Sequence, residues 1–203
     1  MVRHVRWYAA GLTAAGLLVA TATSALACAC CTHTAWRYVE TEKMSPRRLA
    51  ELEQFQFAKA AKLMVGEADK GIKGVADASE NYELAVARPK GRMVFAFRDE
   101  KGRTGTLALV LPSTISIFEV DPRGKEKDSG LGPSLYKEWK LTANAAGDGL
   151  FRAVVGSGQK ITLVLHGRGI GCTDPGHFTD WTLLVHGPVD KLTMYGALDS
   201  AAQ

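Results

Sequence analysis

The chain has 203 residues, with 25 lysine or arginine and 21 aspartate or glutamate side chains, and a formal net charge of +4. Its first 27 residues are predicted to be a removable export signal that contains Arg3 and Arg6 and no acid, so the mature chain carries only +2. A charge this small argues against nucleic-acid binding, and an apolar content of 46% excludes wholesale disorder. The mature length is typical of one domain.

The first 27 residues contain the three parts of an export signal in the expected order. Arg3 and Arg6 make a positive start, residues 8–20 are an uncharged and mostly apolar run, and residues 25–27 (Ala-Leu-Ala) form a small-x-small cleavage site. The apolar run is shorter than the ~18 residues that a membrane span needs. We therefore predict a bacterial exported protein, periplasmic or secreted, with its signal peptide at 1–27.

Cleavage after Ala27 would make Cys28 the first mature residue. Residues 24–28 fit a permissive lipobox in which Ala25 stands where Leu is preferred. A lipid anchor on Cys28 is therefore an alternative to plain cleavage, and it would be the protein's only attachment to the membrane. The rest of the chain divides into a Cys-rich head and lead segment at 28–45 and a single β-rich domain at 46–203.

One short helix is predicted near the start of this domain, over residues 46–53. Ser45 suits the N-cap and Pro46 suits the first turn, and an apolar residue follows at every third position. Residues 55–65 fit either a helix or a strand. We favour a strand that leads into a turn at Gly66.

Beyond the helix, short runs rich in Val, Ile, Thr, Phe and Tyr alternate with Gly, Asp, Pro and Ser. This spacing is typical of antiparallel all-β folds and not of α/β folds. We predict a mainly all-β fold, an antiparallel β-barrel or β-sandwich of roughly nine strands, with hairpin turns at 99–102 and 147–149. The candidate strands are 82–87, 92–98, 104–111, 115–120, 136–143, 150–155, 160–166, 179–186 and 191–195.

Two of these strands are apolar on both faces, at 107–111 and 161–165. The pattern suits strands that are covered on both sides, or a barrel with an apolar interior. Such a barrel is either filled by side chains or holds a small apolar ligand, and a filled interior is the favoured interpretation. Trp139 and Trp181 are expected in the core.

Four cysteines remain in the mature chain: Cys28, Cys30 and Cys31 lie within four residues, and Cys172 is distant. Export would place them where disulfides persist. A bridge from Cys172 to the head closes a loop of about 140 residues, which contributes roughly 4–5 kcal/mol in the chain-entropy model. Of the remaining head thiols, a Cys30–Cys31 bridge would be vicinal and strained and a Cys28–Cys30 bridge would close a very tight ring, or the two thiols would stay free. Two conventional disulfides therefore fit poorly.

A soft metal ion is another use for these thiols. Cys28, Cys30, Cys31 and His33 offer three thiolates and one imidazole within six residues, and Cys172 is a candidate distant ligand or disulfide partner. Soft sulfur ligands suit Cu(I) and Zn(II). Structural zinc sites usually combine a Cys-x2-Cys pair with a second, distant pair, and that second pair is absent here. The helix N-terminus that accompanies the Cys-x-x-Cys motif of thiol redox proteins is also missing.

The glycine-rich segment 167–177 is a second candidate site, at the rim of the fold. It would combine His166, Cys172, Asp174 and His177. Glycines allow a close approach of the backbone, but a predicted strand follows, which excludes a dinucleotide fingerprint. The sequence offers Cys172 and His177 as a nucleophile and base but no oxyanion hole, so we predict no enzymatic activity.

The sequence therefore predicts an exported, non-enzymatic β-rich protein of the cell envelope whose N-terminal thiol cluster binds Cu(I) or Zn(II). The alternative is a disulfide-stapled carrier or interaction module. Its ligand or partner would bind in the barrel or at the 167–177 loop.

Overall fold

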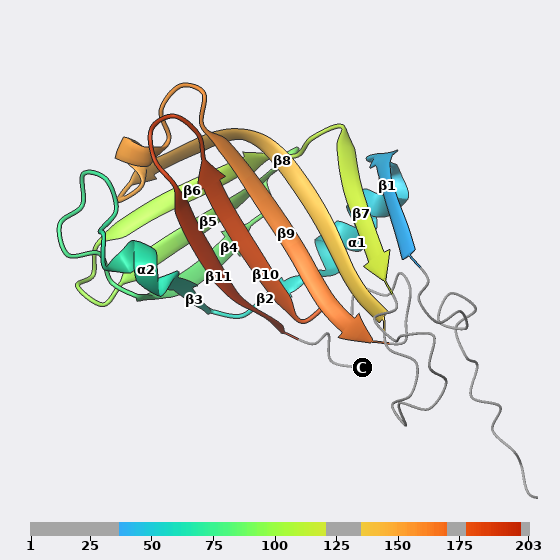
Figure 1. Cartoon of the computed structure of the whole chain (residues 1–203), viewed down its shortest axis with the longest axis horizontal. Coiled ribbons are helices and arrows are strands. Elements are labelled where there is room, and N and C mark those ends of the chain that lie inside the picture. The colour runs from blue at the N-terminus through green and yellow to red at the C-terminus, as the bar shows by residue number, and fades with distance from the viewer. Residues whose placement is uncertain (1–36, 121–134, 170–177, 200–203) are drawn as a thin grey trace, which may run out of the picture.

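The computed structural model describes residues 37–120, 135–169 and 178–199. Their strands pair antiparallel in one sheet that closes into a barrel (Figure 1), so the all-β class is confirmed and the barrel is selected over the sandwich. The elements are β1 (Arg37–Lys43), α1 (Pro46–Gln54), β2 (Gln56–Phe57), β3 (Ala60–Leu63), α2 (Val65–Ala68), β4 (Asn81–Ala87), β5 (Arg92–Asp99), β6 (Thr104–Val110), β7 (Thr114–Val120), β8 (Leu135–Gly149), η2 (Arg152–Val154), β9 (Lys160–Gly169), β10 (Asp180–His186) and β11 (Leu192–Asp199).

Strand β8 closes the barrel. The wall runs β8, β6, β5, β4, β3, β11, β10 and β9, and β9 returns to β8 through ten paired residues. The opposite edge of β8 has two partners, because residues 136–140 pair with β7 and residues 145–149 pair with β6. Strands β7 and β1 therefore leave the barrel wall as a side sheet, which lies beside α1 at the right of Figure 1.

The N-terminal helix forms where its capping residues predict it. The Ser45 hydroxyl accepts a hydrogen bond from the backbone N–H of Arg48 at 3.2 Å, and Pro46 occupies the first turn. The ambiguous stretch that follows is extended as β2 and β3, which supports the strand interpretation. The expected turn at Gly66 is instead the short helix α2.

The predicted hairpin at 147–149 is wrong, because these residues form the last part of β8 and pair with β6. The glycines in this stretch allow β8 to pack closely against β6 and do not form a turn. A Cβ on Gly149 would lie 2.3 Å from the backbone oxygen of Thr104, and the φ of Gly149 is +59°. Only a residue without a side chain lets β8 approach β6 this closely while adopting that backbone angle.

The predicted strand at 150–155 is also wrong. This stretch contains the 3-10 turn η2, and the side chains of Phe151 and Val154 are fully buried. Phe151 packs edge-on against Phe97, with ring centroids 5.3 Å apart. The apolar residues that suggested a strand therefore cover one end of the barrel.

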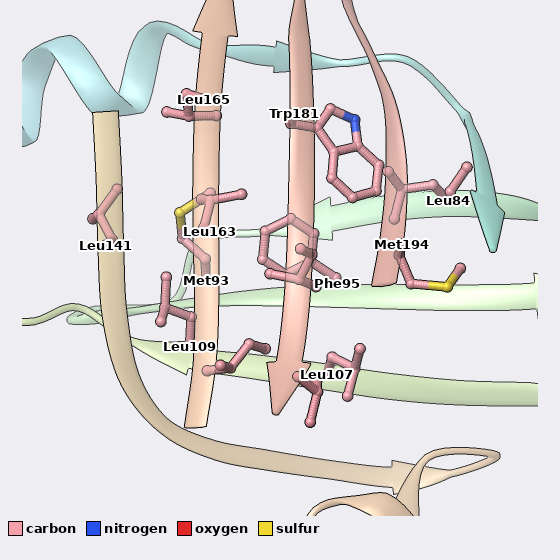
Figure 2. Close-up of a cluster of buried hydrophobic side chains, with 14 of the residues drawn as sticks. Leu84, Met93, Phe95, Leu107, Leu109, Leu141, Leu163, Leu165, Trp181 and Met194 are labelled. Carbon is pink, nitrogen blue, oxygen red and sulfur yellow. The ribbon is translucent and has the colours of Figure 1, made fainter. Parts of the chain in front are cut away.

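Large apolar side chains fill the interior between the described strands. Figure 2 shows Leu, Met, Phe and Trp side chains from opposite walls meeting in the middle. Trp139 and Trp181 are 1% and 0% exposed, which confirms their predicted place in the core. On β6 the outer face carries the partly exposed Ala108 and the exposed Val110, so this strand is covered on its inner face only. The barrel with an apolar interior is thus the correct interpretation of its sequence pattern.

Gly196 makes room for the largest side chain of this interior. It stands opposite Trp181 in the β10–β11 register, and a Cβ there would lie 2.9 Å from the indole and 2.8 Å from the backbone oxygen of Ala60. We predict that Gly196→Ala lowers the free energy of unfolding by about 1–3 kcal/mol because a filled core cannot absorb the extra atom. Urea unfolding measures this. Gly66→Ala is the control, since a Cβ on Gly66 meets nothing within 4 Å.

Asp99 fixes the β5–β6 hairpin and ties it to the loop before β4. Its buried carboxylate accepts hydrogen bonds from the backbone N–H groups of Lys101 and Arg103 and from the Arg103 guanidinium at 2.6 Å. Arg103 also donates to the backbone oxygens of Ala76 and Asp77. Burial alone would raise the pKa of Asp99, but the hydrogen bonds and charge of Arg103, with the bond from Lys101, lower it.

Because the pKa of Asp99 is lower in the folded state, its carboxylate contributes stability above the unfolded pKa of about 3.9, and this is lost as the pH falls through the folded pKa. We predict that Asp99→Asn lowers the free energy of unfolding by about 1–3 kcal/mol at neutral pH. The difference from the parent should shrink at more acidic pH in urea titrations, whereas an unchanged difference would contradict this role. Asp69→Asn, at an exposed position, is the control.

Candidate functional site

The five predicted metal ligands lie outside the described residues. Cys28, Cys30, Cys31 and His33 fall in 1–36, and Cys172 falls in 170–177. Of the predicted rim residues, Asp174 and His177 also fall in 170–177, and His166 alone is described. The described chain does show where each of these segments joins the fold.

The segments that carry the cysteines join the described chain at one end of one sheet. At this end, four residues that are register partners on neighbouring strands form a line across the side sheet and the barrel wall. It runs through Arg37 at the start of β1, Val120 at the end of β7, Tyr136 near the start of β8 and Arg168 near the end of β9. The chain before Arg37 and the chain after Gly169 thus leave from the same edge of the structure, at the lower right of Figure 1.

His166 lies on the outer face beside this edge. The register places it between Glu138 on β8 and Asp180 on β10. Glu138 accepts a hydrogen bond from the Tyr136 hydroxyl at 2.6 Å, and Asp180 accepts one from Thr179 at 2.7 Å. Within the three described ranges, no three His, Cys, Asp or Glu side chains form a metal-binding group.

A cluster of charged residues lies on the inner face of the same end, between α1 and the side sheet. We call Glu42, Arg48, Glu51, Glu119 and Lys137 the ionic cluster. Arg48 donates to Glu42 at 3.2 Å and to Glu51 at 2.9 Å. Burial alone would lower the pKa of Arg48, but the hydrogen bonds to these two carboxylates raise it. Arg48 therefore stays charged and joins α1 to β1.

Lys137 and Glu119 form the most buried part of the ionic cluster, 0% and 6% exposed. They are direct cross-strand partners on the inward face of β8 and β7. Burial raises the pKa of Glu119, and the charges of Lys137 and Arg48 oppose that shift. Their mutual attraction offsets part of the cost of taking both charges out of water.

Aromatic rings separate the ionic cluster from the barrel core. The Arg48 guanidinium lies 5.1 Å from the centre of the Trp139 ring, and the Lys137 ammonium lies 5.7 Å from that of Phe178. Trp139 and Phe178 pack on each other at 5.2 Å, and both contact Phe55. Such cation–π contacts supply a partly polar environment for the buried charges.

Sequence reasoning missed the ionic cluster, although the sequence contained a signal for it. On β8 Lys137 alternates with Trp139 and Leu141, and on β7 Glu119 continues the alternation of Ile115 and Ile117. A charged residue in phase with buried ones marks an inward-facing charge. That the two charges face each other depends on the β7–β8 register, which no local pattern shows.

Comparison with protein-family models, with curated proteins and with solved structures found no match for this chain. In the part of the chain that the structure describes, neither helix has the length and apolar character that crossing a membrane requires.

The buried pair can be tested by removing one charge and then both. We predict that Lys137→Met lowers the free energy of unfolding by about 3–5 kcal/mol, because Glu119 then keeps a buried charge with one partner fewer. Adding Glu119→Leu should recover most of this loss in urea unfolding. If the double variant is less stable than Lys137→Met, the two side chains do not act as a pair. Lys140→Met, exposed on the outer face of the same strand, is the control.

Proposed function

We propose that this chain is an exported, non-enzymatic envelope protein that carries a soft-metal site at one end of its barrel. Cys28, Cys30, Cys31 and His33 are the proposed ligands for Cu(I) or Zn(II), and Cys172 is the distant ligand. The observation that carries the proposal is the strand register, because the segments bearing both groups of cysteines leave the described fold at one edge.

The reach of the two segments agrees with a joint site. Cys31 precedes Arg37 by six residues, and Cys172 follows Arg168 by four. An extended residue spans about 3.3 Å, so these segments reach about 20 Å and 13 Å. Three strand spacings of about 4.8 Å separate Arg37 from Arg168, about 14 Å along the sheet. Thiols from both segments can therefore meet above the sheet edge.

The packed interior also favours a site at this end. Between the described strands, residues such as Leu63, Phe95 and Leu163 are 0% exposed and pack from opposite walls. A filled barrel leaves little room for a ligand inside it. The packing therefore favours a rigid scaffold with a site at its end over a carrier that holds its ligand in the interior.

A disulfide staple is the second candidate function for the same cysteines. The shared edge favours it equally, because a bridge from Cys172 to the head would tie the start of the mature chain to the end of β9. In this case the cysteines stabilise the fold, and a partner would bind elsewhere on the barrel. Lipid on Cys28 would remove that thiol from either arrangement.

Native mass spectrometry of the exported protein, purified without reductant, tests the proposal. We expect the mass of the chain from Cys28 onward plus one copper or zinc, with fewer than four hydrogens lost to disulfides. Cys30→Ser and Cys31→Ser should each lose the metal, because a thiolate ligand is removed. Thr32→Ala, which changes the head without removing a ligand, should keep it.

Two results would overturn the metal site. A mass four hydrogens below that of the mature chain, without metal, means two disulfides and supports the staple. Metal uptake by Cys30→Ser and Cys31→Ser equal to that of the parent means that the head does not bind it. A mass increase equal to a diacylglycerol on Cys28 identifies a lipoprotein, and metal content then decides whether the other ligands suffice.

A further inference from the structure

The outer wall of the barrel has a hollow surface that the metal proposal does not use. Two adjoining hollows of about 420 Å³ each lie over the outer face of β3 to β6 and the end of β8. The first is lined mainly by β4, β5 and β6, and the second by β3, β4 and the β5–β6 hairpin. Glu83 and Arg98 belong to the linings of both, so they stand where the hollows meet.

Small side chains make the floor of the first hollow. Ala85 on β4 pairs with Ala96 on β5, and Ala96 pairs with Thr106 on β6, all on the outward face. The longer side chains of Glu83 and Arg98 lie two residues from Ala85 and Ala96 on the same strands, and so on the same face. A low floor beside longer charged side chains gives a depression in the outer wall.

The two charges between the hollows are available to a ligand. Glu83 and Arg98 are direct register partners and both are exposed. Neither side chain forms a hydrogen bond or an ion pair with the rest of the described chain. The acidic groups around the hollows are engaged: Asp99 is held by Arg103, Asp148 by Arg152, and Glu100 by Asn81. The exposed Lys59 at the second hollow adds one further cation without a partner in the described chain.

This arrangement selects a ligand that carries both signs of charge. A simple anion at Arg98 would face the carboxylate of Glu83, and a simple cation at Glu83 would face the guanidinium of Arg98. Cross-strand partners have Cβ atoms about 5 Å apart. The long Glu83 and Arg98 side chains can diverge from there toward the two charged ends of a tripeptide, which spans up to about 10 Å. The free hydroxyls of Thr104 and Thr106 border the same hollow and supply further hydrogen-bonding groups.

We propose that these hollows bind a short peptide with free ends. Its carboxylate pairs with Arg98, its ammonium pairs with Glu83, and its backbone lies on the alanine floor. The volume of either hollow falls within the range of about 300–1,000 Å³ that is usual for ligand sites. The site is independent of the cysteines, so it stands or falls separately from the metal proposal.

The test titrates trialanine into the ¹⁵N-labelled full chain and follows the amide signals. We expect saturable shifts at Ala85, Ala96 and Thr106. N-acetyl-trialanine and trialanine amide should each bind about ten-fold more weakly, because each lacks one charge. Arg98→Gln should weaken the binding of free trialanine by a similar factor. It should not further weaken the binding of trialanine amide, which has no carboxylate to pair with Arg98. Glu83→Gln should likewise weaken the binding of free trialanine and should not further weaken the binding of N-acetyl-trialanine, which has no ammonium to pair with Glu83.

Arg92→Gln is the matched control, since Arg92 lies on the same face of the same strand outside both hollows. It should bind trialanine like the parent. The ¹⁵N spectrum of each variant shows whether it is folded, and the exposed positions of residues 83 and 98 make unfolding unexpected. Shifts that do not saturate, or equal affinities for the free and blocked peptides, would overturn the proposal. So would parental binding by both Arg98→Gln and Glu83→Gln.

Discussion

The pairing of β8 along both of its own sides is the constraint on which the rest of the structure depends. Ten residues of β8 pair with β9 and close the barrel, while its other edge changes partner from β7 to β6. This change is possible because Gly147 and Gly149 let the second half of β8 lie close to β6. Without the pairing of β8 with β6, the ring of strands would stay open between β6 and β9.

Strand β8 also carries one residue of the buried charge pair. The first half of β8 carries Lys137 to the junction of the barrel and the side sheet, where Glu119 faces it. Helix α1 covers this junction with Arg48, whose partners Glu42 and Glu51 lie on β1 and on the helix itself. A buried charge pair stabilises less than an apolar pair of the same shape, but it is costly to break. Loss of either charge at this junction is therefore expected to be more costly than replacement of both.

Because the barrel interior is filled with side chains, binding sites are expected on its outer surface and at its ends. Core residues from facing walls occupy the described interior, and Gly196 is needed to fit Trp181 among them. The outer wall, in contrast, combines small residues with unengaged charges at Glu83 and Arg98. The two proposed sites lie in these two regions, the thiol site at the edge where Arg37 and Arg168 align and the peptide site on the β4–β6 wall.

The sequence by itself determined the all-β class, the helix at 46–54 and most strands, because capping residues and alternating apolar residues act locally. It misled at 147–155, where glycines and apolar residues suit a hairpin but serve strand contact and closure of the barrel end. Only the tertiary structure decided that Lys137 faces Glu119, that Glu83 faces Arg98, and that the two cysteine-bearing segments leave from one edge. Each of these depends on strand register, which is set by residues distant in the chain.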